Sequence, residues 1–197
     1  MTKIISKPRI ILIGGPAGAG KSTLALELAY KMKIKQIVDL DTVREVLRGE
    51  HNKTNDPYLF SSSYEAWKLE GSEDSESIIR AFEKYSLSLK KAVDRIIERV
   101  DVLGKDTIIE GVHIVPSFYK KYIRRKNTRF IMLTPANAKV HKNNFIKRRD
   151  EFHGMDIQEY FDNFEKINII NKYLINDAKK NKCQILVNDG KLAMVAN

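Results

Sequence analysis

Residues 9–23 read R-I-I-L-I-G-G-P-A-G-A-G-K-S-T, and this stretch decides the fold. An apolar run of strand length leads into a glycine-rich turn, and apolar residues at helical spacing follow it. Every fixed position of the pattern G-x-x-x-x-G-K-S/T is filled, by Gly15, Gly20, Lys21 and Ser22. The order of strand, loop and helix is the context that this pattern requires, so the stretch predicts a loop that binds polyphosphates.

The spacing of the glycines has a physical reason. A loop that wraps a polyphosphate points successive backbone N–H groups inward, which favours residues without bulky side chains at the tight positions. The positive end of the helix dipole then faces the phosphates, where Lys21 reaches the outer phosphates and Ser22 ligates Mg²⁺. The expected cradle consists of Gly15, Pro16, Ala17, Gly18, Ala19, Gly20, Lys21, Ser22 and Thr23. A glycine-rich turn without a ligand is the alternative.

The length and composition are those of one globular domain, residues 1–197. No apolar run approaches the ~18 residues of a membrane span, and Cys183 is the single cysteine, which excludes an internal disulfide. The first residues lead straight into the expected strand and leave no room for a signal peptide. We therefore expect a cytoplasmic protein with no membrane segment.

The charge balance favours anionic partners. The chain has 35 Lys and Arg against 25 Asp and Glu, a formal net charge of +10. Nucleic acid and a phosphorylated metabolite both fit this charge. No basic tail or basic strand with interleaved aromatic residues marks a nucleic-acid module, so a small anionic metabolite is the favoured partner and nucleic acid the alternative. The sequence does not indicate an oligomeric state.

Strand and helix patterns alternate along the chain, which predicts a three-layer α/β fold with a five-stranded parallel sheet. The expected strands are residues 10–13, 36–38, 107–110, 129–134 and 184–187. The expected helices after the second strand include one long helix over 78–100, a basic helix over 117–126 and a further long helix over 156–181. Residues 49–77 form a polar, mobile excursion, and residues 136–155 a basic region that resembles a lid.

Three carboxylates follow the expected strands, at the edge of the sheet where α/β folds bind ligands. Asp39 and Asp41 share one side of an extended chain, so one can orient a Mg²⁺-bound water and the other accept a proton from an attacking hydroxyl. We expect Asp41 to act as the base or as the group that orients the water, and its alternative is a helix N-cap. Glu110 ends the third strand and is expected in the Mg²⁺ shell with Ser22 and Asp39.

Further candidates surround these carboxylates. Ser63, Tyr64 and Lys68 in the excursion are expected to contact the substrate, although Tyr64 could simply pack the excursion onto the core. His113 is a substrate candidate or a plain loop histidine. Basic side chains that close over a migrating phosphoryl group are expected from Lys142, Lys147, Arg148 and Arg149, with Arg148 as the catalytic candidate. The alternative for this run is a solvated helix face.

Five blocks of the sequence together resemble the archaeal 2-phosphoglycerate kinase family, over residues 9–149. They are GGPAGAGKST at 14–23, DLDTVREVLR at 39–48, SSSYEAWK at 61–68, TIIEGVHIVP at 107–116 and FIMLT at 130–134. The phosphate loop is shared by many nucleotide-binding proteins, whereas the second, third and fourth blocks are far more specific. Some family members carry an additional N-terminal domain similar to an ATP cone, but here the first strand begins at once, and we expect no regulation by such a domain.

The resemblance implies strand order 2-3-1-4-5 and an ATP- and Mg²⁺-dependent kinase. It also implies an acceptor, 2-phosphoglycerate, phosphorylated on its 3-hydroxyl to give 2,3-bisphosphoglycerate. Such an acceptor needs cationic donors, which Arg44 and Arg48 supply from one helix face after Asp41; a solvated helix edge is their alternative. A polynucleotide 5'-hydroxyl kinase, another metabolite kinase and a non-catalytic nucleotide switch are the competing functions. GTP is the alternative to ATP as the phosphoryl donor, because the residues that bind adenine have no firm sequence signature.

Overall fold

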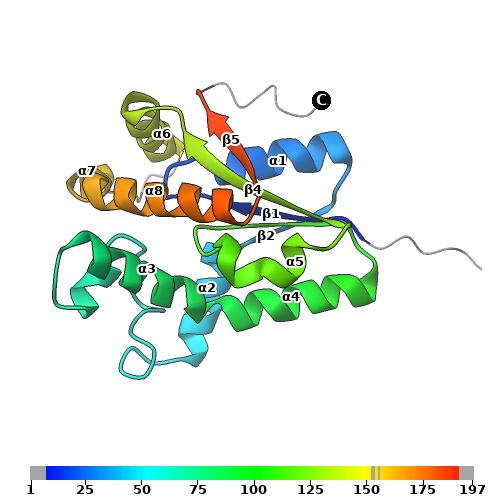
Figure 1. Cartoon of the computed structure of the whole chain (residues 1–197), viewed down its shortest axis with the longest axis horizontal. Coiled ribbons are helices and arrows are strands. Elements are labelled where there is room, and N and C mark those ends of the chain that lie inside the picture. The colour runs from blue at the N-terminus through cyan, green and yellow to red at the C-terminus, as the bar shows by residue number, and fades with distance from the viewer. Residues whose placement is uncertain (1–7, 152–153, 155, 191–197) are drawn as a thin grey trace, which may run out of the picture.

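A computed structural model of the chain describes residues 8–151, 154 and 156–190. Its five strands pair in parallel in the order β2-β3-β1-β4-β5, which confirms the expected topology (Figure 1). The strands are β1 (Ile10–Gly14), β2 (Gln36–Asp39), β3 (Thr107–Glu110), β4 (Thr128–Pro135) and β5 (Gln184–Asn188). The carboxyl end of the central strand β1 therefore opens between β3 and β4, where the phosphate loop begins.

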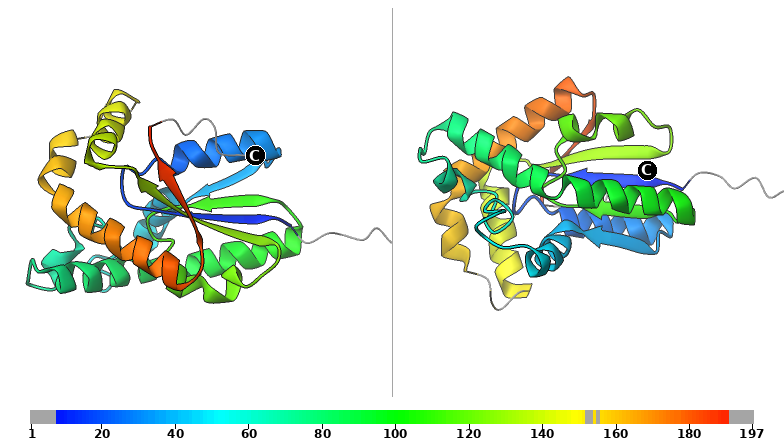
Figure 2. Two further views of the ribbon diagram at one scale, coloured as in Figure 1. Left: turned by 45° about the horizontal axis from the view of Figure 1, so that its top comes forward. Right: turned by 90° about the horizontal axis from the view of Figure 1, so that it is seen from below.

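Helices cover both faces of the sheet (Figures 1 and 2). Successive β1 side chains point to opposite faces, so Ile11 and Ile13 pack against α1 (Lys21–Met32), while Ile10 and Leu12 join the larger core. That core is completed by α3 (Ser75–Ser88), α4 (Lys90–Leu103), η2 (Pro116–Tyr119), α5 (Lys120–Ile123) and α8 (Phe164–Lys180). The three-layer architecture follows from this division.

The expected long helix over 78–100 is wrong in one respect, because Leu89 divides it into α3 and α4. The hydroxyl of Ser88 donates to the carbonyl of Tyr85 at 2.7 Å, and this is the oxygen that an unbroken helix would offer to Leu89. The second long helix is likewise divided at Asn163, into α7 (Ile157–Asp162) and α8. The Asn163 side chain donates to the Glu159 carbonyl at 2.9 Å.

The remaining segments position the site. The excursion after α2 (Leu40–Glu50) contains η1 (Ala66–Leu69) and buries Leu59, Tyr64 and Ala66 in the larger core, so its middle is packed on the domain. The basic helix expected over 117–126 is replaced by the shorter η2 and α5. The lid-like region forms α6 (Ala138–Glu151), and residues 152, 153 and 155 of that region lie outside the described part. No helix in the described ranges is long and apolar enough to cross a membrane.

Candidate active site

The phosphate loop joins β1 to α1 and depends on glycine for its shape. Gly15 has a φ of +154°, and a Cβ there would lie 2.4 Å from the carbonyl oxygen of Leu133. Gly18 has a φ of +72°, and a Cβ there would lie 2.5 Å from the ring of Phe145. Both contacts are far closer than van der Waals distance, so the loop keeps this path only with glycine at these positions.

Lys21 and Ser22 are the first residues of α1 and directly follow the phosphate loop. The Lys21 ammonium donates to the carbonyl of Pro16 at 3.0 Å. Burial lowers the pKa of Lys21, while the nearby Glu110 and Asp41 favour its charged form. The Ser22 hydroxyl donates to Glu110 Oε1 at 2.7 Å, and burial raises the pKa of Glu110 although Lys21 opposes that shift. A hydroxyl and a carboxylate, both hard oxygen donors, thus lie together where the phosphates of a nucleotide would enter.

Asp39 and Asp41 do not share one side of an extended chain, which corrects the sequence prediction. The strand ends at Asp39, and Asp39 rather than Asp41 caps α2: its carboxylate accepts from the N–H groups of Asp41 and Thr42, each at 3.0 Å. The Thr42 hydroxyl donates to the same carboxylate at 2.7 Å. Both oxygens of Asp39 are therefore engaged in the cap, whereas Asp41 lies in the first turn of the helix with its side chain about half exposed.

One cavity of about 120 Å³ joins the phosphate loop to the acidic and basic candidates. Its lining contains seven of the predicted site residues, namely Ala17, Lys21, Asp41, Arg44, Ser63, Tyr64 and Arg148. Four more lining residues were not predicted from the sequence, namely Ser62, Tyr85, Val112 and Tyr160. Tyr85 and Tyr160 fall within the helices expected over 78–100 and 156–181, but helical spacing indicates burial and not which partner a side chain contacts.

Arg44 is fixed at the edge of this cavity. Its Nη1 donates to the Tyr85 hydroxyl at 2.5 Å and lies 3.7 Å from a carboxylate oxygen of Asp41. Tyr85 is buried and stacks on His113, with 4.5 Å between the ring centroids. The Arg44 guanidinium thus lies between the carboxylate of Asp41, the expected base, and the buried side chain of Tyr85.

Three predicted substrate residues lie outside the cavity lining. Arg48 donates to the carbonyls of Leu59 and Ser61, at 2.9 and 3.1 Å, and so fastens the excursion to α2. Lys68 pairs with Glu65 on the surface. His113 is fully buried beneath Tyr85 without a hydrogen-bond partner for either ring nitrogen among the described residues. Burial lowers the pKa of His113 well below its ordinary value.

The basic residues of α6 do not act as one group. Arg148 lines the same cavity as Lys21. The Lys142 ammonium instead lies 5.0 Å from the ring centroid of Phe164, where a cation–π contact explains its position. Of the lid candidates, Arg148 is the one among the lining residues of this cavity.

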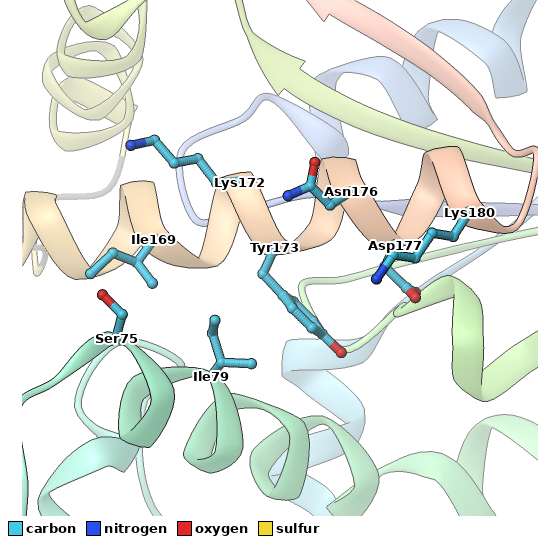
Figure 3. A pocket seen from close by; sticks show the side chains of 8 residues that line it. All are labelled: Ser75, Ile79, Ile169, Lys172, Tyr173, Asn176, Asp177 and Lys180. Carbon is cyan, nitrogen blue, oxygen red and sulfur yellow. The ribbon is translucent and has the colours of Figure 1, made fainter.

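A larger cavity, of about 360 Å³, lies between α3 and α8 and contains no residue of the phosphate loop (Figure 3). Tyr173 points from α8 toward α3, and its hydroxyl donates to Glu83 at 2.6 Å. Asp177 accepts from the backbone N–H of Ser117 at 2.7 Å. These polar groups are engaged in holding the helices together, so the smaller cavity beside Lys21 is the candidate active site.

The parallel sheet order and the glycine-dependent loop define a P-loop fold of the type found in small kinases. Two solved structures share it: shikimate kinase from Acinetobacter baumannii (TM-score 0.53, 15% identity, 95% of this chain and 88% of that chain) and TT1252 from Thermus thermophilus (TM-score 0.50, 16% identity, 95% and 92%). At these identities the likeness concerns the fold alone. No family model matches the chain.

The resemblance to 2-phosphoglycerate kinases is confirmed by curated relatives. The 2-phosphoglycerate kinase of Methanocaldococcus jannaschii is 36% identical over 183 residues, which cover 92% of this chain and 59% of that protein. The 2-phosphoglycerate kinase of Pyrococcus furiosus is 33% identical over 182 residues, with the same two shares. The chain therefore spans about three fifths of the length of these relatives.

Proposed function

We propose that this protein transfers the terminal phosphoryl group of ATP to the 3-hydroxyl of 2-phosphoglycerate, giving 2,3-bisphosphoglycerate. The observation that carries the proposal is the shared cavity, in which Lys21 of the phosphate loop meets one carboxylate, Asp41, and two guanidinium groups, Arg44 and Arg148. An acceptor with a phosphate and a carboxylate close together needs such paired cations beside its reacting hydroxyl. The similarity to named 2-phosphoglycerate kinases supports this choice of acceptor.

Each residue then has a defined task. The loop N–H groups and Lys21 bind the phosphates of ATP, and the half-buried position of Lys21 strengthens its attraction for them. Asp41, partly open to the cavity, accepts the proton of the attacking hydroxyl. Arg44 binds an anionic group of the acceptor, and Arg148 lies between acceptor and donor, where negative charge spreads during transfer.

Mg²⁺ fits the oxygen donors of Ser22 and Glu110 at the N-terminus of α1. Ser22 would hold the ion together with the nucleotide phosphates, and Glu110, which accepts the Ser22 hydrogen bond, would orient its shell. When bound, the ion neutralises charge on the phosphates. Asp39 serves the site by capping α2 and thereby placing Asp41 and Arg44. A cytoplasmic location, where ATP and the acceptor are made, belongs to the same proposal.

A panel assay with product identification tests the function. ATP and GTP are each supplied with 2-phosphoglycerate, 3-phosphoglycerate, glycerate, nucleosides or an oligonucleotide with a free 5'-hydroxyl, and the phosphorylated product is identified. We expect ATP with 2-phosphoglycerate to give the highest kcat/KM. Preference for the oligonucleotide would make the protein a polynucleotide kinase, and nucleotide binding without any transfer would make it a switch.

A further inference from the structure

Side chains from two distant segments bind three consecutive carbonyl groups of the phosphate loop. His141 Nε2 lies 2.7 Å from the carbonyl oxygen of Ala17, and Asn144 Nδ2 donates to that of Gly18 at 2.9 Å. Asn188, which ends β5, donates to the carbonyl of Ala19 at 2.9 Å. His141 and Asn144 are three residues apart and therefore lie on one face of α6.

These contacts set the direction of the loop's N–H groups. In a trans peptide the carbonyl of one residue and the N–H of the next point in opposite directions. A carbonyl of Ala17 that is turned toward His141 therefore turns the N–H of Gly18 away from α6. Asn188 holds the carbonyl of Ala19 and therefore turns the N–H of Gly20 away from the end of β5. The N–H of Ala19, which follows the carbonyl held by Asn144, donates to the carbonyl of Pro16 at 3.2 Å and closes the turn.

Packing reinforces the hydrogen bonds. Phe145, the next residue of α6, is fully buried with its ring against Gly18. His141 stacks on the same ring, with 5.1 Å between the centroids. The first turns of α6 and the phosphate loop are thus one packed unit, and the helix cannot swing away without breaking two hydrogen bonds and exposing Phe145.

We propose that His141 and Asn144 are positioning residues that preorganise the phosphate loop for polyphosphate by holding the carbonyls of Ala17 and Gly18 outward. The inference rests on the proposed nucleotide-dependent transfer but not on the identity of the acceptor. His141 acts as a donor, since a carbonyl oxygen only accepts, so its neutral ring carries hydrogen on Nε2. A loop whose N–H groups already face the ligand needs less ordering when the ligand binds.

The chain offers matched variants for the test. Asn144→Asp replaces the donor with a carboxylate of the same shape, and Asn143→Asp makes the same change at the exposed neighbouring position of α6. His141→Leu removes the donor, whereas His141→Gln keeps an N–H at a similar distance from the backbone. Dissociation constants for tripolyphosphate and for ATP are measured by calorimetry on the full chain, with urea unfolding as a measure of folding. Tripolyphosphate reports on the loop without any contribution from adenine or acceptor.

Asn144→Asp and His141→Leu should each weaken tripolyphosphate binding about tenfold, while Asn143→Asp stays within about twofold of wild type. His141→Gln should restore most of the affinity, which distinguishes a donor from a residue that only fills space. If Asn144→Asp does not fold, the two His141 variants still decide. Equal affinity of His141→Leu and wild type would overturn the inference, and a wild-type protein that binds no tripolyphosphate would overturn it together with the proposed function. Tight binding without any acceptor phosphorylation would overturn the proposed function alone.

Discussion

Tyr85→Phe is the change that tests most sharply how the acceptor side is built. The substitution keeps the ring that stacks on His113 and removes only the hydroxyl that accepts from Arg44 Nη1 at 2.5 Å. Arg44 is largely buried, and its Nε has no hydrogen-bond partner among the described residues. The guanidinium group would therefore lose its principal neutral partner and turn toward Asp41, 3.7 Å away.

A hydrogen bond to a charged group contributes about 1.5–3 kcal/mol. If half of that is lost from acceptor binding, about 0.75–1.5 kcal/mol, the KM for 2-phosphoglycerate rises roughly three- to twelvefold, because about 1.4 kcal/mol corresponds to a factor of ten. The free energy of unfolding should fall by about 1–2 kcal/mol, a loss that a domain of ordinary stability survives. The KM for ATP should stay unchanged, since the Tyr85 hydroxyl supports Arg44, which we assign to the acceptor.

Steady-state kinetics with each substrate varied in turn provide the measurement, and urea unfolding the stability. Tyr30→Phe is the matched control, because the side chain of Tyr30 is 88% exposed on α1. An unchanged KM for 2-phosphoglycerate in Tyr85→Phe would show that Arg44 does not depend on this support. A rise in the KM for ATP alone would refute the assignment of Arg44 to the acceptor.

Three further predictions concern the ionisable side chains of Lys21, His113 and Glu110. Lys21→Ala should lower kcat by roughly two to three orders of magnitude in the same kinetic assay, with the circular-dichroism spectrum unchanged; a wild-type rate would remove Lys21 from the mechanism. Burial holds the pKa of His113 well below its ordinary value of 6.5, so the unfolded chain takes up a proton below about pH 6.5 that the folded chain refuses, and stability falls as the pH falls. His113→Phe should remove that part of the pH dependence in urea titrations at several pH values, and an identical dependence in both proteins would contradict the buried, neutral histidine. Burial raises the pKa of Glu110, so the free energy of unfolding falls as the pH rises from 4.5 through the raised pKa. Glu110→Gln should therefore be more stable than wild type at neutral pH, while its Mg²⁺-dependent activity falls. A variant less stable than wild type at neutral pH would contradict the raised pKa.

The strands and the phosphate loop could be predicted from the sequence because local patterns determine them. A buried parallel strand is an uninterrupted apolar run, and a loop that must wrap phosphate needs glycine at set positions, here Gly15, Gly18 and Gly20. These features do not depend on the rest of the chain. The strand order came from family resemblance rather than from the residues themselves.

The helix breaks and the cap of α2 were not predictable in the same way. Leu89 continues the apolar spacing of its helix, so spacing alone predicts no break there. At each break a polar side chain, of Ser88 or of Asn163, donates to a carbonyl of the preceding turn, and apolar spacing does not show such a bond. Asp39 and Asp41 both suit an N-cap, and the choice is decided by where β2 stops pairing with β3. A shift of two residues in the cap moved Asp39 from the expected metal shell into a structural role.

The supports of the site depend on contacts between distant segments. The hydroxyl of Tyr85 in α3 accepts from Arg44 in α2, although the two residues are 41 positions apart. Asn144 and His141 meet the phosphate loop across more than 120 positions. Periodicity places such residues inside the protein, but only the folded chain shows which groups they bind.

Direct detection of the transferred phosphoryl group tests the central claim. Phosphorus NMR of a mixture of the protein, ATP, Mg²⁺ and 2-phosphoglycerate should show the terminal phosphate signal of ATP decline while a second phosphomonoester signal appears on the acceptor. The signals of 2,3-bisphosphoglycerate should grow with wild type and be nearly absent with Lys21→Ala. Loss of the ATP signal to inorganic phosphate alone, or the same product with Lys21→Ala, would contradict phosphoryl transfer at this site.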